Sequence, residues 1–168
     1  RWGGMTWADA FMHMCTTMSL GGFSSHDASF GYWDSPLLES ISIVFMALSG
    51  ISFLRYFMVI RRRSLLPVVR DREIQAYVTV LLASIALLTL LLVSQGTYET
   101  AAAALRASAF HVVSLATTTG YASTDYTLWP VFAPVLLMFL GCFASCAGST
   151  GGGIKMVRMV LLIKQARR

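Results

Sequence analysis

Charged residues are scarce in this sequence, and the residue types that build catalytic or metal sites are scarcer still. Only 12% of its 168 residues are charged, about half the share of a soluble domain (about 25%). The carboxylates are scattered, and no nucleophile–base pair emerges, which predicts that the chain is not an enzyme. Three cysteines, Cys15, Cys142 and Cys146, lie among apolar or small residues, and we interpret them as packing residues rather than metal ligands.

Long apolar runs take the place of the missing charge. Residues 76–93 contain no charged side chain, and as a helix these 18 residues span roughly 27 Å, close to the hydrocarbon thickness of a bilayer. Residues 37–60 form a second apolar segment of 24 residues, with Glu39 near its start and Arg55 near its end. The pattern predicts an integral membrane protein, because a soluble protein with a basic face does not accommodate the uncharged run.

The basic residues are concentrated in two regions, which hold ten of the thirteen: Arg61, Arg62, Arg63, Arg70 and Arg72 between the apolar segments, and Lys155, Arg158, Lys164, Arg167 and Arg168 near the C-terminus. By the positive-inside rule both regions are cytoplasmic, and Asp27, Asp34 and Asp125 then face outside. The net charge of +5 therefore indicates membrane topology rather than nucleic-acid binding. The chain begins without Met or a signal-peptide pattern, so we expect it to be part of a longer membrane protein.

The sequence contains an internal repeat with an offset of 98 residues. HMCTTMSLGGFSSHD (13–27) aligns with HVVSLATTTGYASTD (111–125), so that His13 meets His111 and Gly22 meets Gly120. Each copy contains a short apolar helix (6–17 and 100–115), a Ser/Thr/Gly segment, an acidic loop and a further apolar helix that begins near a proline. The short helices cannot cross a bilayer, so each Ser/Thr/Gly segment turns within the membrane, where irregular backbone must be buried or line a water-filled path.

A re-entrant helix followed by free carbonyl groups is the way a cation selectivity filter is built. The alternative is an ordinary Thr/Gly loop between two helices. Repetition of the same order of features favours the filter.

The last apolar helix of the second copy is interrupted. Residues 130–140 cover roughly 16 Å, half a bilayer, then 13 mostly small residues (141–153) precede a resumed helix over 154–163. Three consecutive glycines weaken a helix by about 1 kcal/mol each relative to alanine, and a broken helix in a membrane marks a cavity or a moving part. Tight helix packing through small residues is the alternative. GSTGGGIK resembles a phosphate-binding loop, but Ile154 and Met156 break that motif, so we predict no nucleotide site.

These motifs together carry a family resemblance. TTGYA (118–122) is similar to the potassium-channel filter T-V-G-Y-G, and LGGFS (20–24) is its counterpart in the first copy. The chain resembles the Trk/Ktr/HKT superfamily of potassium transporters, and specifically its bacterial TrkH-type subunits, in which four non-identical helix–pore-helix–helix repeats surround one pore. The resemblance covers essentially the whole chain and identifies it as a fragment with the second repeat (residues 1–73) and the third (74–168).

The resemblance implies an all-α, potassium-channel-like fold with re-entrant filter loops and a broken helix. It implies potassium uptake through carbonyls of two filter segments, gated by an intramembrane loop; the alternative is a non-conducting scaffold or assembly subunit. The implied filter residues are Ser19, Leu20, Gly21, Gly22, Thr117, Thr118, Thr119 and Gly120. The implied gate residues are Gly141, Gly148, Ser149, Thr150, Gly151, Gly152 and Gly153.

The resemblance also implies a setting. The chain is expected in the bacterial inner membrane as a multi-pass protein, with no cofactor and K⁺ as the only, transported, ion. Its expected partners are lipid, the remaining pore repeats of the parent chain, a second copy in a homodimer and a cytosolic nucleotide-binding regulatory subunit, and not nucleic acid. Selectivity for potassium alone or for potassium and sodium stays open, as does whether Lys155 and Arg158 pass partner motion to the loop or face lipid headgroups.

Four polar side chains in apolar segments need a separate interpretation. Arg55 precedes the arginine cluster by about six residues, roughly 9 Å of helix, and is expected to reach the cytoplasmic surface in a structural role. Arg106 is expected on a pore helix, with a partner that the sequence does not identify. His13 and His111 occupy matching positions, and we expect them to bond a neighbouring helix rather than bind an ion.

Overall fold

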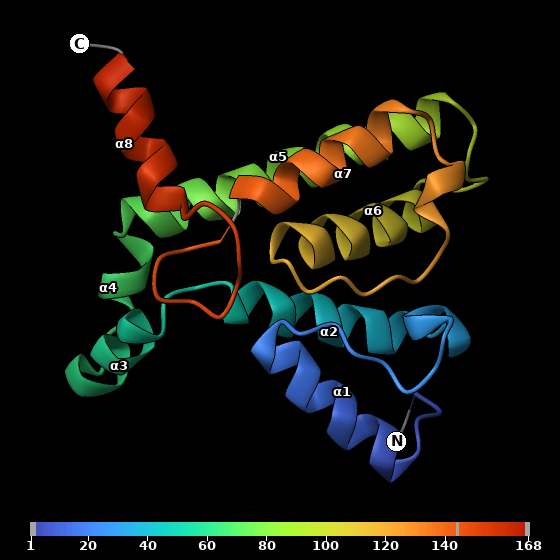
Figure 1. Cartoon of the computed structure of the whole chain (residues 1–168), viewed down its shortest axis with the longest axis horizontal. Coiled ribbons are helices and arrows are strands. Elements are labelled where there is room, and N and C mark those ends of the chain that lie inside the picture. The colour runs from blue at the N-terminus through green and yellow to red at the C-terminus, as the bar shows by residue number, and fades with distance from the viewer. Residues whose placement is uncertain (1–2, 144, 167–168) are drawn as a thin grey trace.

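The computed structural model describes residues 3–143 and 145–166, and over these ranges the protein is helical with no β-strand. The elements, in chain order, are α1 (Trp7–Ser19), the 3₁₀ turn η1 (Ser29–Tyr32), α2 (Pro36–Ser49), α3 (Phe53–Arg62), α4 (Leu66–Val69), α5 (Arg72–Ser94), α6 (Ala101–Ala116), the 3₁₀ turn η2 (Tyr126–Leu128), α7 (Phe132–Phe143) and α8 (Met156–Ala166) (Figure 1). The predicted all-α class is confirmed.

Helix α5 is long and apolar enough to cross a membrane. Its 23 residues extend roughly 34 Å. Asp71 caps its first turn by accepting the backbone N–H of Glu73 at 2.7 Å. One face, which includes Tyr77 and Leu88, is buried against the other helices, while Leu82 and Leu90 on the opposite face are exposed. These leucines form an apolar face of α5 that the described residues leave exposed.

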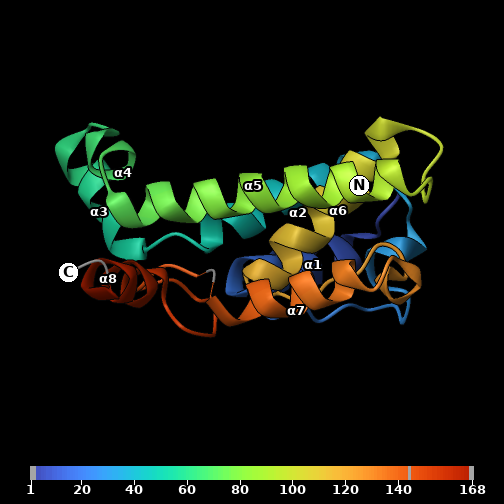
Figure 2. The same ribbon diagram turned by 90° about the horizontal axis from the view of Figure 1, so that it is seen from above.

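The repeat predicted two short helices, and α1 and α6 are these helices. Helix α6 packs between α5, α2 and α7, and α1 packs against α2 (Figures 1 and 2). Because α6 has neighbours on several sides, even its polar residues His111, Ser114 and the following Thr117 are fully buried. Both short helices begin at a threonine cap, with Thr6 accepting the N–H of Asp9 and Thr100 that of Ala103, each at 3.2 Å.

The prediction of one continuous apolar helix over 37–60 is wrong. The chain bends by 87° between α2 and α3. The backbone at the bend bonds to the loop that follows α7: Phe53 donates its N–H to the carbonyl of Gly148 at 3.0 Å, and Cys146 donates to the carbonyl of Gly50 at 3.2 Å. A Cβ at Gly50 would overlap the Tyr77 hydroxyl, so the bend also depends on a residue without a side chain.

The interruption after α7 is real but displaced. Helix α7 continues to Phe143, and helix resumes at Met156 rather than at 154. Gly141 is therefore helical, which corrects its predicted place in the loop; its predicted role as a gate residue stays a prediction. Ala144, inside the predicted stretch, and the basic residues Arg167 and Arg168 lie outside the described residues. We call residues 145–155 the intramembrane loop below.

Candidate functional site

The two predicted filter segments have the same unusual backbone. In the first, Leu20 and Gly22 have positive φ angles of 55° and 68°. In the second, the positions 98 residues later, Thr118 and Gly120, have φ angles of 62° and 87°. A side chain disfavours this conformation, so its appearance at Leu20 and Thr118 means that the surrounding structure imposes it. In both copies, two left-handed residues are separated by one residue that is not left-handed.

Each segment is tied to the end of its own pore helix by the same bonds. The N–H of Gly21 donates to the carbonyl of Thr16 at 2.9 Å, and the Thr16 hydroxyl donates to the carbonyl of Phe23 at 3.0 Å. In the second copy the N–H of Thr119 donates to the carbonyl of Ser114 at 2.8 Å, and the Ser114 hydroxyl donates to the carbonyl of Tyr121 at 2.7 Å. A hydroxyl one turn before the helix end therefore holds the segment against the helix in both copies.

The two segments lie against each other. A Cβ on Gly22 would overlap the carbonyl oxygen of Thr119, so the backbones approach more closely than a side chain permits. The loops beyond them are also joined, because Phe30 donates its N–H to the carbonyl of Ala122 at 3.0 Å. Nothing lies within 4 Å of the place where a Cβ on Gly120 would stand. The pair of segments is thus closed where Gly22 meets Thr119 and open at Gly120.

Tyr121 connects the later segment to the pore helix of the earlier copy. Its side chain is 1% exposed. Its hydroxyl bonds to the Thr16 hydroxyl, accepts from the Thr17 hydroxyl at 3.3 Å and donates to the His13 carbonyl at 3.4 Å. Phe23, the equivalent residue in the earlier copy, is 77% exposed. The sequence identified Tyr121 as part of the motif but not its partners.

The two histidines have matching structural roles, as expected, but different partners from those expected. His13 uses Nδ1 at 2.8 Å from the Asp9 carbonyl and Nε2 at 3.0 Å from the Ser24 hydroxyl. His111 makes the corresponding contacts at 2.9 and 3.1 Å, with the carbonyls of Ala107 and Thr124. Each ring joins its own helix to the loop after the filter segment, rather than to a neighbouring helix as predicted.

The acidic loop after the second filter segment is held by Asp125. Its carboxylate accepts the hydroxyl of Thr127 at 2.6 Å and the backbone N–H of the same residue at 3.0 Å. These bonds stabilise the ionised form and lower the pKa of Asp125. The loop therefore keeps its negative charge well below neutral pH.

The intramembrane loop bonds to the ends of both pore helices. Gly152 donates its N–H to the Thr118 hydroxyl at 2.7 Å, and Thr150 donates its hydroxyl to the Met18 carbonyl at 3.5 Å. A Cβ on Gly151 would come within 3.1 Å of the Thr117 carbonyl oxygen. In Figure 1 the loop descends from α7 toward the junction of α2 and α3 and returns to α8. It lies directly against the filter segments.

Two charged residues hold this loop in place. The Lys155 ammonium donates to the carbonyl of Gly151 and lies 3.3 Å from the Ser145 hydroxyl, which itself donates to the carbonyl of Gly152 at 2.6 Å. The Glu73 carboxylate, on α5, accepts the backbone N–H of Ala147 at 2.7 Å and that of Val157 at 3.3 Å. The sequence analysis used Lys155 to assign topology and left open whether it acts on the loop, and it did not identify Glu73. The glycine run before Lys155 predicted a loop, but not the residues that bind it.

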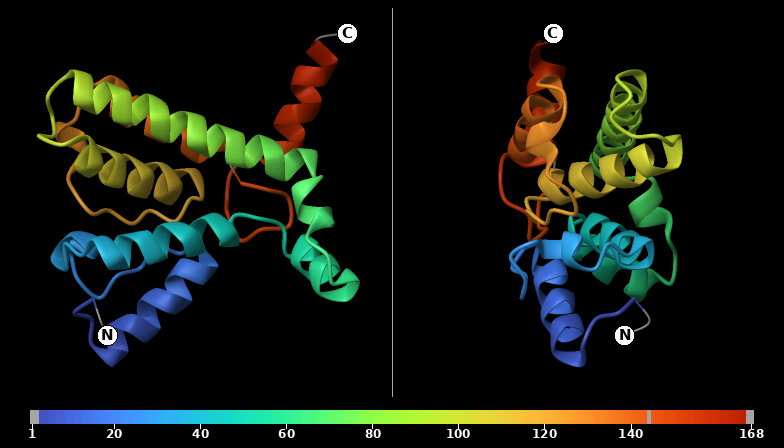
Figure 3. Two further views of the ribbon diagram at one scale, coloured as in Figure 1. Left: turned by 180° about the vertical axis from the view of Figure 1, so that it is seen from behind. Right: turned by 90° about the vertical axis from the view of Figure 1, so that its right-hand side faces the viewer.

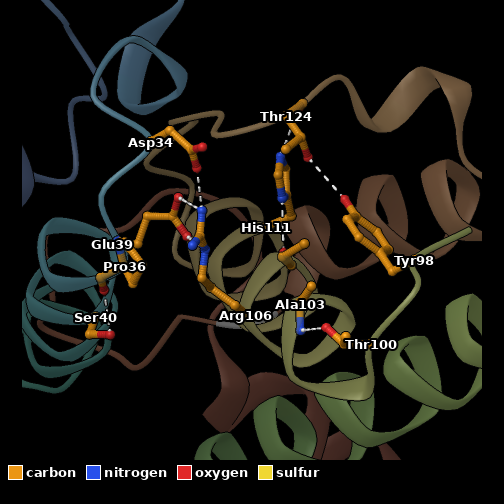
Figure 4. A network of polar contacts seen from close by, with 11 residues as sticks. Asp34, Pro36, Glu39, Ser40, Tyr98, Thr100, Ala103, Arg106, His111 and Thr124 are labelled. Atoms are coloured by element: carbon orange, nitrogen blue, oxygen red, sulfur yellow. Dashed lines mark hydrogen bonds and ion pairs between the residues drawn. The ribbon is translucent and has the colours of Figure 1, made fainter.

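The partners of the two apolar-segment arginines are carboxylates. Arg106 forms ion pairs with Asp34 and, at 2.9 Å, with Glu39, whose side chain is 2% exposed (Figure 4). This ties the pore helix α6 to the first turn of α2. Arg55 pairs with Asp71, the residue that caps α5. Each ion pair joins two elements of the fold, and the structural role expected of Arg55 stays a prediction.

Replacing Arg106 with methionine is expected to destabilise the full-length protein by about 3 kcal/mol, because the buried Glu39 carboxylate loses its partner. The measurement is the fraction of folded protein after heating in detergent. The double variant Arg106→Met/Glu39→Met should recover part of the loss, since it leaves no buried charge. Arg158→Met, at an exposed cation, is the control and should behave as wild type. If the stability losses of the two single variants simply add up in the double variant, the pairing of Arg106 with Glu39 is contradicted.

The chain is similar to known transport proteins over nearly its whole length. Residues 3–168 match the family model TrkH, described as cation transport protein. Among curated proteins, the Trk system potassium uptake protein TrkH is 41% identical in Salmonella typhimurium and 40% identical in Escherichia coli, each over 165 residues. Escherichia coli TrkG is 35% identical over 167 residues. The matches cover 98–99% of this chain and 34% of each relative.

A solved structure supports the same comparison. The crystal structure of the potassium transporter TrkH from Vibrio parahaemolyticus superposes with a TM-score of 0.94 at 37% identity, covering 98% of this chain and 36% of that one. The chain thus spans about a third of the length of the relatives it matches.

Proposed function

Because the chain belongs to the TrkH family of cation transport proteins, we propose that it supplies two filter segments and a gate to a pore for potassium uptake. The relatives are named as potassium uptake proteins. Since the chain spans about a third of their length, further repeats of the parent chain complete the pore on the side where Gly120 is open. The chain works in this proposal as a passive path and not as an enzyme.

The observation that carries the proposal is the pair of matched segments. Each follows a helix too short to cross a bilayer, each has left-handed backbone at alternate residues, and the two are in contact at Gly22 and Thr119. Backbone of this kind within a membrane is tolerated where it lines a water-filled path. We propose that carbonyls of residues 19–22 and 117–120 replace water around K⁺. The names of the relatives support potassium as the transported ion.

The intramembrane loop is proposed as the gate. It lies between the filter segments and the arginine-rich end of the chain, which the positive-inside rule assigns to the cytoplasm. Its small residues, Gly148, Ser149, Thr150, Gly151, Gly152 and Gly153, allow it to change shape at little steric cost. Lys155 and Glu73 hold the closed form, because each binds backbone groups of the loop. Movement of α5 or α8 would release these bonds.

The proposals on membrane location and partners rest on the family rather than on this fragment alone. We propose a multi-pass protein of the bacterial inner membrane that assembles with the remaining repeats of its parent chain and with a second copy. A cytosolic nucleotide-binding subunit is proposed to regulate it, and no cofactor other than the transported K⁺ is needed.

Replacing Tyr121 with phenylalanine tests the filter assignment with a one-atom change. The hydroxyl bonds to Thr16, Thr17 and His13 across the two repeats, and its loss lets the filter segment shift. We expect the preference for potassium over sodium in uptake by the full-length protein to fall about fivefold, on the basis of about 1 kcal/mol for the net loss of buried hydrogen bonds.

The matched control is Tyr126→Phe. Among the described residues the Tyr126 hydroxyl makes no hydrogen bond, although its ring packs on His111, so uptake and preference should match wild type. Unchanged preference in Tyr121→Phe would mean that the segment does not select the ion, as a non-conducting scaffold requires.

A further inference from the structure

Helix α3 lies across the end of the bundle and exposes apolar side chains. It makes an 87° angle with α2 and stands at the end of the molecule where α5 begins (Figures 1 and 3). Its outer face carries Phe53, Leu54, Phe57 and Ile60, which are 46–76% exposed. A helix with an apolar outer face and basic residues, set across the ends of spanning helices, lies in the membrane interface. Sequence patterns did not predict this helix, because they do not locate the bend.

A cavity beside this helix is lined by arginines. Its volume is about 780 Å³, and its lining includes Arg55 and Arg62 from α3, Arg70 after α4 and Arg72 at the start of α5, together with Ser64. We call it the arginine pocket. The four guanidinium groups come from three consecutive elements, so the fold and not a single run of sequence brings them together.

Most of the charge in the pocket is uncompensated. Arg55 is paired with Asp71, whose side chain is 6% exposed. Within residues 3–143 and 145–166, Arg62, Arg70 and Arg72 make no ion pair with a carboxylate. Three unpaired guanidinium groups around one cavity favour an anion, and a guanidinium matches two phosphate oxygens at once.

We propose that the arginine pocket binds the phosphate of an anionic phospholipid, whose acyl chains lie along the exposed face of α3. The pocket and the apolar face are adjacent, which suits a molecule with an anionic head and a hydrocarbon tail. A soluble anion would leave the apolar face uncovered. An acidic protein segment is less suited, because it would match the charge of the pocket but leave the apolar face of Phe57 and Ile60 uncovered. Basic pockets at this level of a membrane protein recognise such headgroups.

The test uses the purified full-length protein in detergent, titrated with phosphatidylglycerol or phosphatidylcholine and followed by native mass spectrometry. Wild type is expected to bind phosphatidylglycerol at least about tenfold more tightly than phosphatidylcholine, and Arg62→Gln/Arg70→Gln should lose about tenfold of that affinity. The matched control is Arg61→Gln/Arg63→Gln, which removes the same charge from the same segment outside the pocket. The control should stay within about twofold of wild type.

Four results would overturn the proposal. Equal losses in the two double variants would mean that diffuse charge attracts the lipid. Displacement of phosphatidylglycerol by inorganic phosphate at millimolar concentration would make the ligand a soluble anion. If Arg62→Gln/Arg70→Gln binds phosphatidylglycerol normally but no longer binds a cytosolic protein that wild type binds, the arginine pocket is a protein-binding surface. Equal binding of the two lipids by wild type, which involves no substitution and therefore no risk of misfolding, would also exclude the site.

Discussion

Gly22→Ala in the full-length protein is expected to reduce potassium uptake by about tenfold or more and to weaken the preference for potassium over sodium. A Cβ on Gly22 would overlap the carbonyl oxygen of Thr119, in the neighbouring filter segment. Because the obstacle is backbone, it cannot rotate away, and one of the two segments must move. A left-handed residue with a side chain adds strain of about 1 kcal/mol or more.

Two further glycines separate the effect of position from the effect of backbone strain. Gly120 is also left-handed, and its open side is the side that we propose further repeats complete, so Gly120→Ala in the full-length protein should also reduce uptake and the preference for potassium. Gly96, in the loop between α5 and α6, has a φ of 66° and equally open surroundings. Gly96→Ala should therefore leave selectivity unchanged.

Uptake of both ions is measured per folded molecule, with the amount of folded protein taken from size-exclusion chromatography. If Gly22→Ala and Gly96→Ala discriminate between potassium and sodium equally well, the filter assignment is wrong.

Deleting residues 147–150 from the full-length protein is expected to raise potassium flux several-fold while the preference over sodium is kept. The deletion removes the Thr150 contact with the Met18 carbonyl and the Ala147 contact with Glu73. A shorter loop between α7 and α8 no longer reaches across the path below the filter. The filter segments themselves are untouched, so selection of the ion should persist.

The alternative for this region is tight helix packing through small residues. It predicts the opposite result, because the deletion would then disrupt the bundle and reduce both folded protein and flux. Replacing residues 147–150 with four glycines keeps the length of the loop and should leave flux close to wild type. Potassium flux into proteoliposomes, measured per folded molecule, distinguishes the gate from tight helix packing. A fall in that quantity in the deletion variant would leave the gate without support.

The candidate site was predicted in outline, and its connections were not. The filter segments, their glycines and the interrupted helix were located to within a few residues, because a short helix, a Ser/Thr/Gly segment and a glycine run are local patterns. The roles proposed for these residues still await the measurements above. Glu73 was not recognised, since a carboxylate next to arginines on the sequence is typical of a solvated loop.

Features that depend on neighbouring residues could be predicted from the amino-acid sequence. The uncharged run over 76–93 predicts a helix long and apolar enough to cross a membrane, and α5 is such a helix. Thr6 and Thr100 start helices through bonds to residues three positions away. Gly22 and Gly120 are left-handed, as expected of residues without a Cβ.

The place where the chain bends and the partner of each polar group depend on contacts between segments that are distant in the sequence. The α2–α3 bend is stabilised by the carbonyl of Gly148, nearly a hundred residues away, and Arg106 and Tyr121 find partners 67 to 108 positions away. In an apolar environment a backbone or charged group that leaves regular structure needs such a partner. Its energy therefore depends on a distant segment, which no local pattern encodes.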